Sequence, residues 1–309
     1  MRISNLGFIN TVKRNLATPA EEMGRLYAQT SSGKRLQKLS DDPQAMVRAL
    51  GAHASLGELE ARRSVAQQGQ ELLSATDTAL GRVTDSLSQA KDLALRAATS
   101  SLGDSERAAL ADQVRSLRSA LVLTGNANVG GHYLFSGSRT DTPPLQEGAT
   151  AALPVAYEGN YTALTYQASA DQRTAVGFTG AEVFNYPDGS GTRAVPDVDQ
   201  DVFSTLSSLA DAIETGDNTQ LGQLTTDLDQ LHAHTVNLRA QGGVLAQQWS
   251  ATLSAADDTS ILLNQVLADE ESVDYTSAIV ELSNLQTAYQ AALGLTSQML
   301  SLPNLFDQQ

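Results

Sequence analysis

Apolar residues at both ends of the chain repeat at alternating steps of three and four. Near the N-terminus the stripe consists of Ile9, Val12, Leu16, Pro19, Met23, Leu26 and Thr30. Near the C-terminus it consists of Tyr275, Ile279, Leu282, Gln286, Tyr289, Leu293, Thr296 and Leu300. Because this alternation keeps a narrow stripe on one side of a slightly underwound helix, each end is predicted to be one helix of a bundle.

These two terminal helices are predicted to be assembly surfaces. Ordering the backbone costs about 1–2 kcal/mol per residue, whereas a large apolar side chain returns about 1.5–3 kcal/mol when it is fully buried. One stripe per helix supplies few such side chains, so we expect the ends to be mobile in the free subunit and to order on assembly. The predicted interface residues are Ile9, Val12, Leu16, Met23, Leu26, Ile279, Leu282, Tyr289, Leu293 and Leu300.

The middle of the chain has a different composition. Nine of the fifteen aromatic residues lie there, together with clustered glycine and proline: Tyr133, Phe135, Tyr157, Tyr161, Tyr166, Phe178, Phe184, Tyr186 and Phe203. Short alternating runs such as residues 161–166 are typical of half-buried strands between turns. We predict a small β-rich insert over residues 131–200.

The order of these segments predicts a mainly α fold in which a long antiparallel helical rod, or coiled-coil bundle, is formed from both chain ends. Short linkers favour antiparallel packing of the outgoing and returning helices. The predicted divisions are an N-terminal assembly arm (1–42), an outgoing helical rod (43–130), the β-rich outer insert (131–200), a returning helical rod (201–268) and a C-terminal assembly arm (269–309).

Local signals predict where individual helices begin, bend and pack. Thr18 followed by Pro19 predicts a kink or a restart inside the first helix, and Asp42 followed by Pro43 predicts a helix start. Each glycine inside a helix costs about 1 kcal/mol relative to alanine. Close helix packing is therefore the expected reason for four glycines in the outgoing rod: Gly51, Gly57, Gly69 and Gly81.

Composition argues against several classes of partner. The net charge of −15 opposes a nucleic-acid partner, because phosphate binding requires a cationic surface. No apolar stretch approaches the roughly 18–20 residues of a membrane helix, so no membrane insertion is expected. The first residues lack the apolar core of a cleavable signal peptide, and the chain contains no cysteine for a disulfide, a thiolate metal site or a nucleophile. Export would need a route without a cleaved signal.

No set of residues predicts a catalytic, cofactor or metal site. His232 and His234 are two apart on a helix, so their side chains point about 200° away from one another and cannot both face one ion. Asp41 and Asp42 are better explained as helix capping beside Pro43 than as an acid–base pair. We expect a protein that is not an enzyme and that carries no cofactor.

Five segments carry a resemblance to a known family. Residues 31–43, SSGKRLQKLSDDP, resemble the N-terminal signature of the flagellin superfamily. Residues 131–144, GHYLFSGSRTDTPP, are similar to the flagellar hook–filament junction proteins, the hook-associated protein 3 family. Segments at 201–203, 239–243 and 286–293 match the same family in the same order. The resemblance covers essentially the whole chain, although residues 303–306, PNLF, depart from the Leu-rich ending that is common there.

The resemblance implies an extracellular subunit of the bacterial flagellum that joins the hook, through hook-associated protein 1, to the flagellin filament. It implies pairing of the two terminal helices around a central channel, self-association in a junction ring, and export by the flagellar type III system with an escorting chaperone.

Two other functions remain open beside this one. The first is flagellin itself, the filament subunit. The second is a surface adhesin or binding module in which Tyr157, Tyr161 and Tyr166 would stack on a ligand, although an aromatic core is the expected use of those rings.

Overall fold

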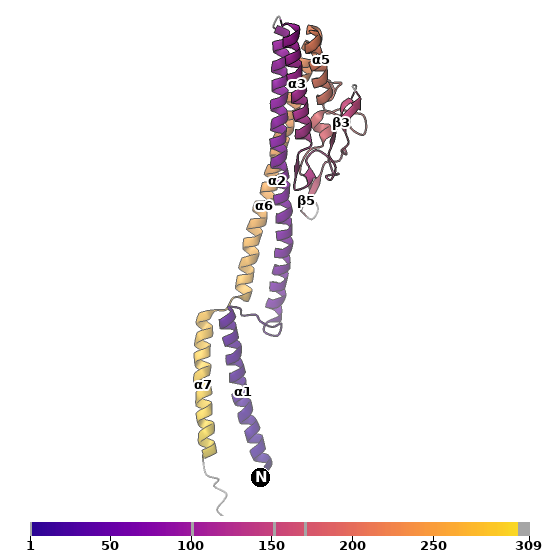
Figure 1. The fold of residues 1–309 in the computed structure, drawn as a ribbon. Coiled ribbons are helices and arrows are strands. Elements are labelled where there is room, and N and C mark those ends of the chain that lie inside the picture. The colour runs from indigo at the N-terminus through magenta and orange to yellow at the C-terminus, as the bar shows by residue number, and fades with distance from the viewer. Residues whose placement is uncertain (1, 100–101, 151–152, 170–171, 302–309) are drawn as a thin grey trace, which may run out of the picture. The chain divides into compact units, whose positions relative to one another are not determined.

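The computed structural model describes residues 2–99, 102–150, 153–169 and 172–301 (Figure 1). Contacts divide the chain into unit 1, Met1–Leu59 with Asp258–Gln309, and unit 2, Glu60–Asp257. The described helices are α1 (Arg2–Ser32), α2 (Pro43–Thr99), α3 (Asp104–Gly125), α4 (Gly180–Phe184), α5 (Val202–Thr215), α6 (Asn218–Glu271) and α7 (Tyr275–Ser301). The fold is therefore mainly α, as predicted.

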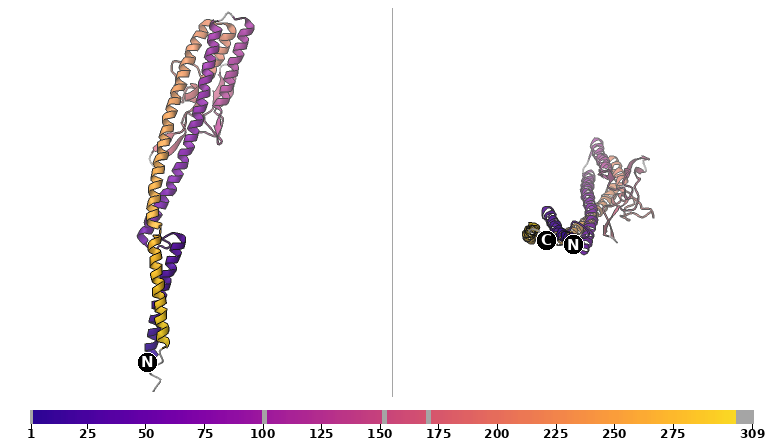
Figure 2. Two further views of the ribbon diagram at one scale, coloured as in Figure 1. Left: turned by 90° about the vertical axis from the view of Figure 1, so that its left-hand side faces the viewer. Right: turned by 90° about the horizontal axis from the view of Figure 1, so that it is seen from below.

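Unit 1 contains two antiparallel helix pairs. In one pair α1 contacts α7, and the two helices lie side by side (Figure 2). In the other, the first residues of α2 pack against the last residues of α6 through a small cluster of Leu36, Ala45, Ala49, Ala52 and Leu267. The small side chains of this cluster bring the two helices close together but bury little apolar surface, so unit 1 has a thin interior.

Unit 2 is a helical bundle in which α2 and α6 again run antiparallel. Asp77 of α2 pairs with Arg239 of α6 at 2.9 Å, and Lys91 pairs with Asp229. The residue number therefore rises along one helix while it falls along the other, which confirms the predicted antiparallel packing within this unit. Helices α3 and α5 pack on each other beside them.

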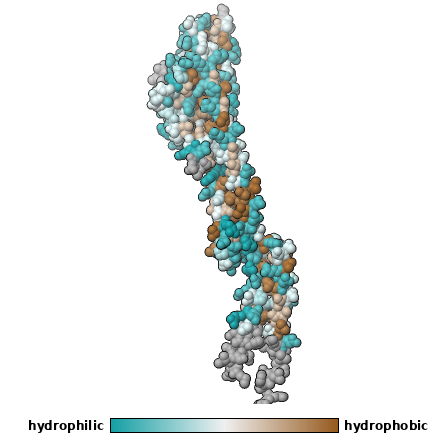
Figure 3. Space-filling view, turned by 180° about the vertical axis from the view of Figure 1, so that it is seen from behind, coloured by the Kyte–Doolittle hydropathy of each residue, from teal (hydrophilic) through white to brown (hydrophobic). Residues whose placement is uncertain are grey.

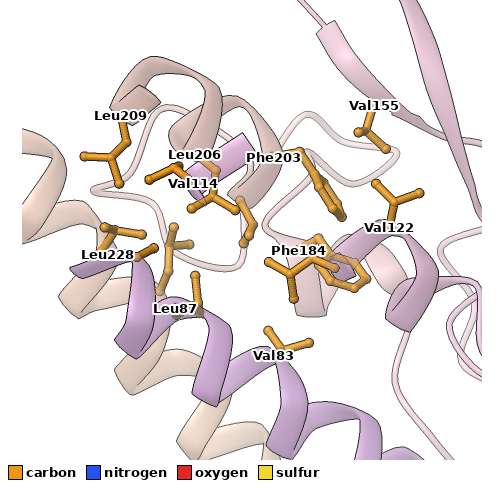
Figure 4. Close-up of a cluster of buried hydrophobic side chains, with 14 of the residues drawn as sticks. Val83, Leu87, Val114, Val122, Val155, Phe184, Phe203, Leu206, Leu209 and Leu228 are labelled. Atoms are coloured by element: carbon orange, nitrogen blue, oxygen red, sulfur yellow. The ribbon is translucent and has the colours of Figure 1, made fainter. Parts of the chain in front are cut away.

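A large hydrophobic core joins these helices to the insert (Figure 4). Leu87 and Leu228 come from α2 and α6, whereas Phe184 and Phe203 come from the insert and from the first turn of α5. The rings of Phe184 and Phe203 lie 5.0 Å apart between their centroids. Most of the apolar surface that can stabilise the chain is therefore buried in unit 2.

In the part of the insert that the structure describes, the strands form three antiparallel hairpins rather than one sheet. Their strands are β1 (Asn128–Val129) with β2 (His132–Tyr133), β3 (Leu145–Thr150) with β4 (Leu153–Tyr157), and β5 (Thr165–Ser169) with β6 (Gln172–Ala175). Two-stranded hairpins are marginal alone, so each depends on the helices behind it. The predicted strand at 161–166 is wrong for its first four residues, because β5 begins only at Thr165.

Trp249 fixes the last hairpin to the helices. Its buried ring lies in a cluster with Val176, and its indole N–H donates to the carbonyl of Ala175 at 3.2 Å. A Cβ atom on Gly69 would lie 3.0 Å from Val176 and 3.2 Å from the indole. Close packing is therefore the confirmed reason for glycine at position 69.

Other local predictions divide into confirmed and wrong ones. Helix α2 begins at Pro43 as predicted, and the Asp42 carboxylate accepts from the amide of Ala45. Of the kink or restart predicted at Pro19, the restart is wrong, since α1 runs through that residue, and the kink stays a prediction. Packing within the chain also fails to explain Gly51 and Gly57, because no other element among the described residues comes within 4 Å of a Cβ placed there.

Candidate assembly surfaces of the terminal helices

The predicted stripe of α1 lies on the side that contacts α7. Leu26 is buried, while Leu16 and Met23 are half-buried at the expected steps. Because these positions alternate by three and four, they stay on one side of the helix along its length. The side chains of Ile9 and Val12 lie outside the described residues.

On α7 the buried stripe coincides with the predicted one only in part. Ala278, Leu282, Leu285, Tyr289, Ala292 and Thr296 are half-buried or buried and also alternate by four and three, and Gln286 beside them is half-buried as well. Four residues, Leu282, Gln286, Tyr289 and Thr296, belong to both the predicted and the buried stripe. Ile279 is 56% exposed and Leu293 is 43% exposed, so these two lie beside the α1-facing stripe, and the side chain of Leu300 lies outside the described residues.

Large apolar side chains on α7 thus face away from α1. Ile279 is accompanied by exposed Val280, and Leu293 by exposed Leu295. The contact with α1 is partly polar, since the side-chain amide of Gln286 donates to the hydroxyl of Tyr27 at 2.6 Å. The α1–α7 pair therefore buries little apolar surface between its helices and leaves other apolar surface open to a partner.

Backbone hydrogen bonds tie together the two connectors of unit 1, the segments that link α1 to α2 and α6 to α7. The amide of Arg35 donates to the carbonyl of Glu271 at 2.6 Å, and the amide of Val273 donates to Gly33 at 3.2 Å. Lys34 and Ser272 accordingly form an isolated antiparallel bridge. The two connectors therefore pair in a fixed register beside the terminal helices.

Ion pairs surround this crossing, which we call the connector cluster: Lys34, Arg35, Asp42, Arg48, His53, Glu270 and Glu271. Arg48 donates to both oxygens of Glu270, at 2.6 and 3.0 Å. Glu271 accepts from Lys34 at 3.0 Å, and its other oxygen lies 2.7 Å from His53 Nε2. Every pair joins the first 60 residues to the end of α6 or lies within the first connector, so the cluster holds the register of unit 1.

The same contacts shift the pKa values of the acidic members. Hydrogen bonds from Arg48 lower the pKa of Glu270, and hydrogen bonds from Lys34 and His53 lower that of Glu271. The pKa of Asp42 is lowered first by the backbone amide of Ala45 and further by Arg35. All three carboxylates are therefore charged well below neutral pH, which is what pairing with cations requires.

His234, one of the two histidines considered as metal ligands, has an ordinary structural contact. His234 Nε2 lies 2.8 Å from the carbonyl of Glu182. Throughout the described part of the chain, no three histidine or acidic side chains gather closely enough to hold a metal ion. Among these same residues, no helix combines the length and the apolar character that crossing a bilayer requires.

Comparison with known proteins places these features in a class. Residues 3–140 match the bacterial flagellin N-terminal helical region. The matched part includes α1, the first connector, α2 and α3.

Over nearly its whole length the chain resembles flagellar hook-associated protein 3. That protein from Salmonella typhimurium is 26% identical over 314 residues, covering 94% of this chain and 95% of the relative. The Escherichia coli protein of the same name is also 26% identical, over 98% of both chains. These relatives are flagellar components by name, and the similarity supports a structural role in the flagellum.

Solved structures share the fold. Hook-associated protein 3 from Legionella pneumophila superposes with a TM-score of 0.61 at 15% identity, covering 71% of this chain and 97% of that structure. FlgL from Xanthomonas campestris gives a TM-score of 0.60 at 16% identity, covering 70% and 99%. A mainly helical chain with a small β insert is therefore the architecture of this group.

Proposed function

We propose that this protein is a structural subunit that joins the flagellar hook to the flagellin filament. Its terminal helices contact neighbouring subunits, with hook-associated protein 1 on one side and flagellin on the other, and copies of the chain associate with one another in the junction. The protein acts outside the cell after export through the flagellar type III system, escorted by a chaperone before export.

One observation carries the proposal: the similarity to flagellar hook-associated protein 3 extends over 94% of this chain and 95% of the relative. A match to the N-terminal helices alone would not separate a junction protein from a filament subunit. The match to hook-associated protein 3 goes well beyond residues 3–140, because it covers 94% of this chain.

The character of unit 1 supports assembly through the chain ends. Ile279 and Leu293 of α7 expose apolar surface that the α1 contact leaves uncovered. Burying such side chains on assembly would gain roughly 25 cal/mol per Å² of apolar surface removed from water. The same surface supplies a direct test of the proposal.

The experiment compares filament growth in a strain that lacks the gene and carries plasmid-borne variants. The unaltered chain should restore filaments, whereas Ile279→Asp with Leu293→Asp should leave flagellin secreted as monomer. Val244→Asp is the matched control, because Val244 is 57% exposed on α6 but belongs to unit 2. Normal filaments in the strain without the gene would overturn the proposal.

Flagellin itself is the second candidate, because residues 3–140 match the flagellin N-terminal helical region. Abundance separates the two functions. A filament subunit should dominate the protein of sheared flagella, whereas a junction protein should be a minor band beside a much more abundant flagellin.

A further inference from the structure

Unit 1 has an apolar face on α2 that its own pairing with α6 does not use. Ala45, Ala49 and Ala52 face α6. On the opposite side Val47 is 66% exposed and Leu50 is 57% exposed. Steps of 100° per residue continue this side through Ala54, which is also exposed.

This face admits close approach by another chain. Gly51 and Gly57 flank it, and both have open space where a Cβ atom would stand, counting every element among the described residues. The α2 face, defined as Val47, Leu50, Gly51, Ala54 and Gly57, is therefore shallow, with two large apolar side chains beside positions that have little or no side chain. Such a surface accepts protruding side chains from a partner.

A complementary surface lies on α6. Leu263 and Leu267 of α6 pack toward α2, whereas Ile261 is 67% exposed and Leu262 is 62% exposed. We call these two residues the α6 knobs. Figure 3 shows hydrophobic residues gathered over the unit 1 portions of these helices. Because the α2 face and the α6 knobs each point away from the helix that pairs with them, they cannot meet within one chain.

We propose that the α6 knobs of one copy insert into the α2 face of the next copy. This contact deepens the proposed function and rests on it, because it names the surface through which copies of the chain associate. The two surfaces differ, so the contact is head-to-tail. A head-to-tail contact repeats from copy to copy and produces a ring or a helical array, whereas a contact between identical surfaces would stop at a dimer.

The size of the surfaces indicates a weak contact that repeats from copy to copy, and not a tight dimer. Four exposed side chains supply only a fraction of the roughly 1,200 Å² that a stable interface buries. One such contact is weak in dilute solution. In a closed array each copy makes the contact twice and also engages its terminal helices, so the weak contacts act together.

Cross-linking tests the contact directly, because the chain has no cysteine of its own. Leu50→Cys and Leu262→Cys are made as separate full-length variants and treated with a short bis-maleimide reagent. A mixture of the two should yield severalfold more dimer than either variant alone. The variant that carries both cysteines should yield a ladder of dimers, trimers and larger species. Gln67→Cys with Gln248→Cys, exposed on the same helices in unit 2, provides the control pair.

Three results would overturn the inference: equal dimer yield from the control pair, efficient dimers from Leu50→Cys alone, or no ladder from the double variant. Complementation of the gene-deleted strain under reducing conditions separates this inference from the proposed function. Restored filaments without a ladder would remove only the head-to-tail contact. Failure of the unaltered chain to restore filaments would instead remove the proposed function.

Discussion

Single residues in unit 2 have roles that depend on neighbours far away in the sequence. Gly69 and Trp249 are 180 positions apart in numbering, yet the indole ring occupies the space that a side chain at position 69 would need. Sequence spacing predicted that Gly69 would lie at a close contact. It did not predict that Gly69 and Trp249 contact each other, because that contact also depends on Val176 in the segment after β6.

Replacing Gly69 by alanine tests this contact. Alanine usually stabilises a helix by up to about 1 kcal/mol relative to glycine, but here the added Cβ overpacks the indole and Val176, so we expect the free energy of unfolding to fall by roughly 1–2 kcal/mol. Gly222→Ala is the control, because α6 is open at that position. Urea unfolding followed by the fluorescence of Trp249 measures both variants, and equal shifts would contradict the packing account.

Asn185 gives a second prediction at the residue scale. Its backbone has a left-handed φ of 60°. The side-chain nitrogen donates to the backbone carbonyls of Val198 and Gln200, and the side-chain oxygen accepts from the backbone amide of Val195. Asn185→Gly keeps the backbone conformation but leaves buried groups without partners, which costs about 1–3 kcal/mol.

Asn185→Ala should cost about 1–2 kcal/mol more, because alanine also resists that conformation. Equilibrium unfolding in urea ranks the two variants. Equal stability of Asn185→Gly and the unaltered chain would show that the hydrogen bonds contribute nothing.

At the scale of elements, the periodicity of apolar residues predicts helices well and predicts their facing sides less well. The stripe of α1 faces α7 as expected, but on α7 the sequence favoured Ile279 and Leu293 over Ala278 and Ala292. Both choices alternate by three and four. The small residues lie in the contact because they allow the two helices to approach closely. The prediction favoured residues with large apolar side chains instead.

The connector cluster gives a pH-dependent prediction at this scale. The pKa of Glu270 is lowered in the folded chain, so its contribution to stability is complete above its ordinary value and is lost as the pH falls through the lowered one. Glu270→Gln should therefore weaken unit 1 at pH 7, and the difference from the unaltered chain should shrink as the pH falls below the ordinary pKa of a glutamate.

Hydrogen exchange of residues 34–42, compared between the two proteins at each pH, measures the effect of Glu270→Gln. Arg63, paired with Asp257 in unit 2, provides a control through Asp257→Asn, which should leave exchange in that segment unchanged. A constant difference from pH 7 to pH 3 would exclude Glu270 as the titrating group.

At the scale of the whole molecule, burial is uneven between the two units. The large core lies in unit 2, while unit 1 rests on small clusters and on the connector cluster. Composition and segment order predicted helices at both ends and the β insert between them. They could not predict the three separate hairpins or the way the insert packs on the bundle, because these depend on long-range contacts such as Phe184 with Phe203.

The uneven burial yields a prediction about order in solution. We expect amides of residues 13–30 and 275–298 to exchange much faster than those of unit 2 in the free subunit, and to gain protection when the protein is assembled. Hydrogen exchange followed by mass spectrometry on both forms measures this. Strong and equal protection of the terminal helices in both forms would contradict the expected ordering on assembly.

The bridge between the two connectors has a consequence for how the chain is made. Lys34 and Glu271 are separated by 237 positions, so the contact closes one of the longest loops that the chain permits. During translation the first segment must wait until residue 271 has left the ribosome, while the bundle of unit 2 can already form. Helix α1 and the first connector are thus among the last segments to acquire their partners. For most of synthesis the apolar stripe of α1 is therefore available to any protein that recognises an unpaired helix.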